Sequence, residues 1–140
     1  MATFTEEMAE SVRINTSITG VSGSSGTFTE ENLYVVPEGK YAFINPIILS
    51  ASKTGPSMGA NSIVMIDGLG ASTTVELVTR SSSEVVGETI SRIVPDSEFL
   101  DARRVAYGGE TIKFRVTKIT GAVGEAGGSL IADIYIYNRA

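Results

Sequence analysis

The sequence predicts an all-β domain: an antiparallel β-sandwich, most specifically an eight-stranded jelly roll, with a short N-terminal arm or helix. Several short segments alternate apolar and polar side chains, and turns rich in Gly, Pro and Ser separate them. Outside two ambiguous segments, nothing repeats with the period of an α-helix, so the crossover helices of a βαβ fold are not expected. About eight strands joined by long connections favour the double Greek key of a jelly roll.

The chain has 140 residues, the size of one domain. We divide it into an N-terminal arm, residues 1–11, and a β-sandwich domain, residues 12–140. Capping-box spacing in the arm allows a short helix, and a flexible arm is the alternative. Phe4 and Met8 are large apolar side chains of this arm, and we expect them to contact a partner.

The expected strands follow the alternation of side chains along the chain. They are 12–18, 33–36, 41–49, 62–66, 73–79, 90–94, 111–119 and 130–137.

Proline and glycine place the turns between these strands. Pro37 and Gly39 predict a tight reversal, because proline fixes φ and glycine supplies the positive φ. Gly108 and Gly109 predict a second turn. Pro46 has no N–H to donate, so it must lie at an edge, at a bulge or where the strand crosses between sheets.

The segment 96–104 is ambiguous. Asp96 is suited to cap a short helix that carries Phe99, Leu100 and Arg103, and a strand is the alternative. The carboxylates of Asp96 and its neighbours form an acidic group whose spacing matches no known calcium loop. We therefore interpret the group as a charged turn.

Charge argues against two classes of partner. The chain has 11 Lys and Arg against 16 Asp and Glu, a net charge of −5. Phosphate backbones and anionic membranes repel such a protein, so we expect no nucleic acid and no membrane partner. No segment reads as a secretory signal or a membrane span, and we expect the protein to be made in the cytoplasm.

The residue types present also argue against catalysis. The chain contains no Cys and no His, which removes thiol nucleophiles, imidazole bases and the usual zinc ligands. A pair of carboxylates remains formally open for glycoside hydrolysis, but acidic side chains are normally solvated surface. We expect no enzyme activity, no metal and no cofactor.

The aromatic residues divide between core and surface. Phe43 and Phe114 are expected in the core, where aromatic rings bury the most area. Tyr135 and Tyr137 share one face of the last strand, opposite two isoleucines. A strand that is apolar on both faces is either central or covered by a partner, so both tyrosines are candidate partner contacts.

Two segments resemble tailed-bacteriophage virion proteins. One is Leu-Tyr-Val-Val-Pro-Glu-Gly-Lys at 33–40, continuing to residue 49, and the other is Gly-Gly-Glu-Thr-Ile-Lys-Phe at 108–114. In that family, such turns open long strands of a jelly roll. The family most similar in size and composition is the capsid decoration, or cement, proteins. No binding residue carries over, because no position matches a defined interface motif.

The resemblance implies a structural virion protein on the capsid exterior. Such proteins typically form trimers and clamp neighbouring subunits of the major capsid protein, so we expect a homo-oligomer, most specifically a trimer. The alternatives are a phage tail or fibre module that binds a receptor or carbohydrate, and a cellular β-sandwich adaptor.

Overall fold

The structure, a computed structural model, describes residues 8–55, 58–68, 77–81, 89–93, 105–119 and 123–139. These residues form nine β-strands. They are β1 (Met8–Val21), β2 (Phe28–Val35), β3 (Lys40–Lys53), β4 (Ala60–Asp67), β5 (Leu77–Ser81), β6 (Thr89–Ile93), β7 (Val105–Tyr107), β8 (Thr111–Lys118) and β9 (Ala126–Asn138).

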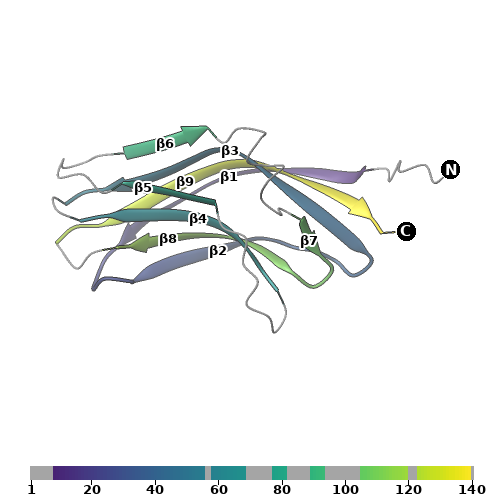
Figure 1. Ribbon diagram of the computed structural model, residues 1–140, viewed down its shortest axis with the longest axis horizontal. Coiled ribbons are helices and arrows are strands. Elements are labelled where there is room, and N and C mark those ends of the chain that lie inside the picture. Colours follow the sequence, from purple (N-terminus) through teal and green to yellow (C-terminus); the bar gives the residue numbers. More distant parts are fainter. Residues whose placement is uncertain are drawn as a thin grey trace.

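The strands form two antiparallel sheets that pack face to face (Figure 1). Sheet A has the order β1-β9-β3-β6, with β7 also paired to β3, and sheet B has the order β2-β8-β4-β5. Without β7, each sheet has four strands, and the first and last strands of the chain are neighbours. This is the eight-stranded double Greek key of a jelly roll. The predicted all-β sandwich is confirmed, and β7 is an addition to it.

The core lies between the sheets and follows the alternation of side chains. In β8 the residues at every second position, Ile112, Phe114 and Val116, are fully buried. In β9, Leu130, Ala132, Ile134 and Ile136 face them from the other sheet and are equally buried. The period of two residues in the sequence therefore identifies the inner faces of both central strands.

Pro46 lies at a bulge, one of the three positions that the sequence allowed. The register between β3 and β9 shifts between Pro46 and Ile48. On the other side of β3, β7 pairs with Tyr41–Phe43 and β6 pairs with Ile48–Ser52. The proline therefore sits where, among the described strands, β3 changes partner and needs no donor on that side.

The two predicted turns are present. Gly39 has φ of 79° and Gly109 has φ of 89°, and Lys40 N–H donates to the Pro37 carbonyl at 3.2 Å. Glycine adopts this region of φ without the steric cost that other residues meet.

The first strand begins at Met8, four residues earlier than the predicted boundary at residue 12. Residues 8–11 therefore belong to the sandwich and not to an arm or helix, and residues 1–7 lie outside the described residues. The alternation of side chains did not predict this part of the strand, because the polar Glu10 lies on the same side as the apolar Val12 and Ile14. Its carboxylate accepts a hydrogen bond from the Tyr34 hydroxyl of β2 at 3.3 Å.

That contact belongs to the seam between the two sheets along β1 and β2. Burial raises the pKa of the Tyr34 hydroxyl, and the negative charge of Glu10 adds to the effect. A second contact crosses the seam where the Thr16 hydroxyl donates to the Glu31 carboxylate at 2.6 Å.

One end of the sandwich is closed by glycines in close contact. A Cβ added to Gly55, after β3, would lie 1.9 Å from the carbonyl oxygen of Val123, before β9. We expect Gly55→Ala to lower the free energy of unfolding by about 1–3 kcal/mol, since the backbone must move apart. Chemical denaturation measures this, and an unchanged stability of Gly55→Ala would mean that the backbones at Gly55 and Val123 do not meet as closely as described.

Two lysines face the interior at the same end. Lys118 of β8 is 3% exposed, and its ammonium donates to the carbonyl of Gly23 at 2.8 Å. Lys53 of β3 is 1% exposed, and its Nζ has no hydrogen-bond partner among the described residues. Of these two amines, one therefore has a partner and the other has none in the described part of the chain.

Candidate functional site

The outer face of sheet A gathers large side chains outside the core. In β9 the inward residues are buried, and the residues between them remain partly exposed. The outward side chains of β9 and of its paired neighbours form rows across the sheet. From one end of the face to the other, these rows are aromatic, then charged at Asp133, then apolar at Ile131 and Ile48, then small.

The aromatic end is a cluster of four rings, Tyr41, Phe43, Tyr107 and Tyr137, which we call the aromatic patch. Tyr41 of β3 is paired in register with Tyr137 of β9 and with Tyr107 of β7. The rings of Tyr41 and Tyr137 stack at 5.4 Å between centroids, and Phe43 meets each of them edge-on at 5.7 Å. Tyr107 lies 6.4 Å from Tyr41 and is 49% exposed.

Backbone hydrogen bonds connect the two turns that lie beside the patch. Val36 donates to the Glu110 carbonyl at 2.9 Å and accepts from the N–H of Gly109 at 2.8 Å, which joins the two turns beside the patch. The guanidinium of Arg139, just beyond β9, lies 5.4 Å from the centre of the Tyr107 ring. Rigid turns and this cation–π contact fix the rings that border solvent.

An ion pair occupies the middle of the face. Asp133 of β9 lies opposite Arg13 of β1, and their side chains form a two-point hydrogen-bonded ion pair. The hydrogen bond and the charge of Asp133 raise the pKa of the Arg13 guanidinium. Tyr135 donates to the same carboxylate at 3.4 Å. Because the Arg13 side chain is 62% exposed, the pair mainly orients side chains and adds little stability.

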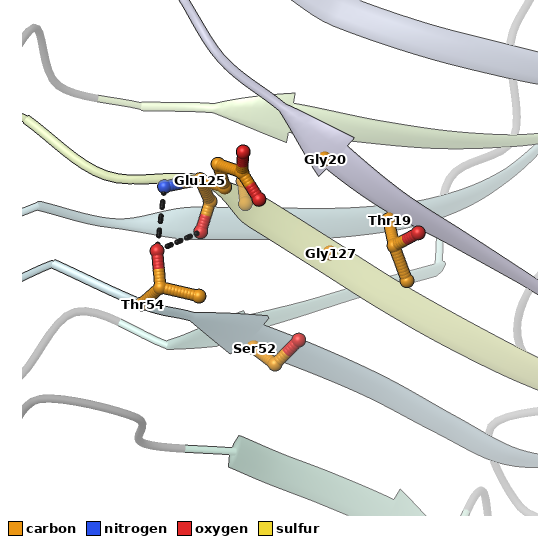
Figure 2. Close-up of a pocket in the computed structure, with 7 residues that line it drawn as sticks. Thr19, Gly20, Ser52, Thr54, Glu125 and Gly127 are labelled. Atoms are coloured by element: carbon orange, nitrogen blue, oxygen red, sulfur yellow. Dashed lines mark hydrogen bonds between the residues drawn. The ribbon is translucent and has the colours of Figure 1, made fainter.

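At the far end of the face the side chains are mostly small, which leaves a depression in the surface (Figure 2). A depression of about 100 Å³ lies over β1, β3 and β9. The Thr54 hydroxyl accepts from the Glu125 N–H at 2.8 Å and fixes the rim. The depression is lined by Thr19, Gly20, Ser52, Thr54, Glu125, Ala126 and Gly127.

The outer face of sheet B has a different character. Glu30 of β2 pairs with Arg115 at 2.8 Å and with Lys113 at 3.6 Å, both on β8, and Lys113 also reaches Asp67 at 2.8 Å. The hydrogen bond to Asp67 is the main cause that raises the pKa of Lys113. Arg115 covers the ring of Phe28 at 4.1 Å. Charges here are neutralised within the chain, so this face offers less to an apolar partner.

The predicted contact residues divide between the patch and its surroundings. Tyr137 belongs to the aromatic patch, and Tyr135 lies in the next row, opposite Phe43. Met8 is paired with Tyr137 across β1 and β9, so three of the predicted residues come from one corner of sheet A. Phe4 lies outside the described residues. Whether these residues contact a partner stays a prediction.

Phe43 lies on the outer face of sheet A, so the prediction that it packs in the core is wrong. Two other rings of the aromatic patch were not predicted. Phe43 was expected in the core with Phe114, but its neighbours Ala42 and Ile44 are buried instead. The strand has apolar residues on both sides, so alternation alone did not decide its inner face. Tyr41 and Tyr107 were missed because their meeting depends on the pairing of β3 with β7.

Other features of chemical interest are limited. Within the residues that the structure describes, no group of three or more Asp and Glu side chains is arranged to hold a metal ion. The acidic group around Asp96, and the choice between helix and strand for 96–104, lie outside those residues. The described part of the chain contains no helix of the length and apolarity that crossing a membrane requires.

No family model matches the chain. No curated protein matches it either.

Solved structures do match at low similarity. A structure described as "Family 16 Carbohydrate Binding Module-2" is 18% identical, with a TM-score of 0.36 over 85% of this chain and 71% of that one. One described as "CBM4 structure and function" is 13% identical, with a TM-score of 0.40 over 88% and 82%. The VP2 subviral particle of infectious bursal disease virus is 9% identical, with a TM-score of 0.38 over 95% of this chain and 38% of that one. At these identities and scores, the matches carry no inference about function.

Proposed function

We propose that the protein is a structural virion component, a capsid decoration protein. It associates with copies of itself, as a trimer, and binds the major capsid protein on the exterior of a tailed-phage head. The observation that carries the proposal is the aromatic patch on the outer face of sheet A. The resemblance of the turns at 33–40 and 108–114 to phage virion proteins supplies the kind of assembly.

Tyrosine and arginine are the side chains that protein interfaces favour most. They dominate the small set of residues that contribute most to binding. Here the rings of Tyr41 and Tyr137 are partly exposed beside Tyr107 and Arg139. A monomer leaves this aromatic surface in water, and assembly removes it from water.

The edge of sheet A supplies a second means of contact. β1 has 14 residues, and β9 is its only strand partner among the described strands. It contains no proline and no lysine to block the addition of another strand. An extended segment of a capsid subunit that pairs with this edge would gain backbone hydrogen bonds. Because such binding favours the assembled shell, it would stabilise the capsid by linkage.

The test is co-sedimentation with undecorated capsids of the same virus. We expect the full chain to pellet with them and to raise the temperature at which they disrupt. Deleting residues 1–7 is expected to weaken the attachment and to leave the sandwich folded, because β1 begins at Met8.

The far-ultraviolet circular dichroism spectrum serves as the control for folding. Absence of the full chain from the pellet at every concentration would refute capsid binding. Equal occupancy by the shortened chain would refute a role for residues 1–7 alone.

Carbohydrate binding by a tail or fibre module is the second candidate. Aromatic rings and a depression lined by hydroxyl groups on one sheet face favour it. The stacking of Tyr41 on Tyr137 counts against it, because each ring already covers one face of the other, and sugar binding requires free ring faces. Glycan-array binding that Tyr107→Ser abolishes would establish this alternative in place of the first.

A further inference from the structure

We infer that copies of the chain meet through the outer face of sheet A, with the aromatic patch as the apolar anchor of the contact. The inference rests on the proposed self-association and names the surface that performs it. Three features of this face support a second copy as the occupant: its size, the distribution of its charges and the orientation of its rings.

The face is large enough for a stable contact. Among the described strands it is four strands wide where β7 and β6 lie beside β3, and three strands wide between them, at residues 44–47 of β3. Its central strand β9 has 13 residues. At about 4.8 Å between strands and about 3.4 Å per residue, the face measures about 19 by 44 Å, or about 800 Å². This is about the area that one partner contributes to a standard interface.

The charges bordering the patch suit a copy of the same surface. Arg139 follows β9, and its N–H donates to the Gly39 carbonyl at 2.9 Å, so it lies beside the turn that carries Glu38. Both side chains are exposed, and within the described residues neither forms an ion pair. One border therefore presents an acid and a base that form no ion pair within the described part of the chain, and the base lies over the Tyr107 ring. A surface with both signs can pair the acid of one copy with the base of the next, either across a two-fold axis or around the ring of a trimer.

The rings are oriented for interdigitation. Tyr41 and Tyr137 stack within 14° of parallel, and Phe43 lies nearly perpendicular to Tyr137, at 89°. Because Tyr41 and Tyr137 stack, each ring covers one face of the other, and the ring edges are left for contact with a partner. Edge-to-face packing is a preferred geometry between aromatic side chains. A second patch can insert its rings between these edges, and Tyr107 is the most accessible member.

The decisive measurement is molar mass in solution over a wide range of protein concentration, by light scattering. We expect three times the 14.7 kDa of the single chain, the mass of the proposed trimer; twice that mass would keep the contact and make it a two-fold one. Tyr107→Ser should raise the dissociation constant for self-association about 10- to 30-fold, the effect of losing a side chain that contributes strongly to an interface. Phe28→Ser is the matched control: Phe28 is 48% exposed and Tyr107 49%, but Phe28 lies on β2 in sheet B. The control should leave association unchanged.

A charge exchange provides a second test without removing a ring. Arg139→Glu should weaken association, and adding Glu38→Arg to the same chain should restore it, since each copy then offers the reversed pair. A monomeric mass at all concentrations, or equal effects of Tyr107→Ser and Phe28→Ser, would overturn the inference. If the second substitution does not restore association, Arg139 and Glu38 do not pair across the contact.

These outcomes separate the inference from capsid binding. If the protein self-associates through the patch but does not pellet with capsids, the decoration function fails and the contact stands. If the monomer binds capsids and never self-associates, the contact fails and capsid binding stands.

Discussion

Replacing Lys53 by methionine is expected to raise the free energy of unfolding by about 1–3 kcal/mol, the cost of a buried polar group that has no hydrogen-bond partner. The Lys53 side chain is 1% exposed, and no described residue forms a hydrogen bond with its Nζ. Burying an amine without a partner costs free energy because its hydration is lost and not replaced. Methionine has a similar shape and lacks this cost. Urea denaturation at a fixed protein concentration measures the difference.

Lys118→Met is the matched control. Lys118 is nearly as buried and ends β8 as Lys53 ends β3, but its ammonium donates to the Gly23 carbonyl. Methionine there leaves that carbonyl without its partner, so we expect no gain in stability, or a loss of about 1–3 kcal/mol. If both substitutions stabilise equally, the hydrogen bond of Lys118 contributes nothing. A lower stability of Lys53→Met would mean that Lys53 has a partner in solution, such as water or an anion.

The sandwich could be predicted from the sequence because its central strands alternate regularly. In β8, Ile112, Phe114 and Val116 alternate with Lys113 and Arg115, and the same parity is buried in the structure. The turns could also be predicted, because a positive φ is a local backbone property that favours glycine. These features depend on neighbours in the sequence, and local chemistry decides them.

The features that were missed depend on distant pairing. β7 has three residues, Val105–Tyr107, too few to show alternation, and it forms because Tyr41–Phe43 of β3 has a free side there. The start of β1 at Met8 is fixed by pairing with the end of β9. Alternation does not reveal such partners.

Only part of the candidate site could be predicted, because alternation does not reveal pairing between distant strands. Tyr135 and Tyr137 could be assigned to one face because they alternate with Ile134 and Ile136, and the structure buries both isoleucines. Phe43 could not, since β3 is apolar on both faces and its bulge after Pro46 changes the parity. The patch exists because three strands bring Tyr107, Tyr41 and Tyr137 into one row. Such a row depends on register between strands far apart in the chain.

Phe114→Ala is expected to lower the free energy of unfolding by about 3–5 kcal/mol, the cost of a large cavity in a packed core. Phe114 is fully buried at the middle of β8, between Val64 of β4 and Glu31 of β2 in register. Domains of this size are stable by about 5–15 kcal/mol, so the substitution removes a large share of the total. Thermal and urea denaturation measure it.

Phe28→Ala is the control, because it removes the same side chain from the same sheet at a site that is 48% exposed. Its loss should be limited to about 0.5–1 kcal/mol, the worth of an exposed cation–π contact such as that with Arg115. Both variants must be measured at one protein concentration, since self-association would add to the stability of each. Equal losses would mean that the inner face of β8 has been assigned wrongly. Because the same alternation sets the outer face of sheet A, the aromatic patch would then lose its basis as well.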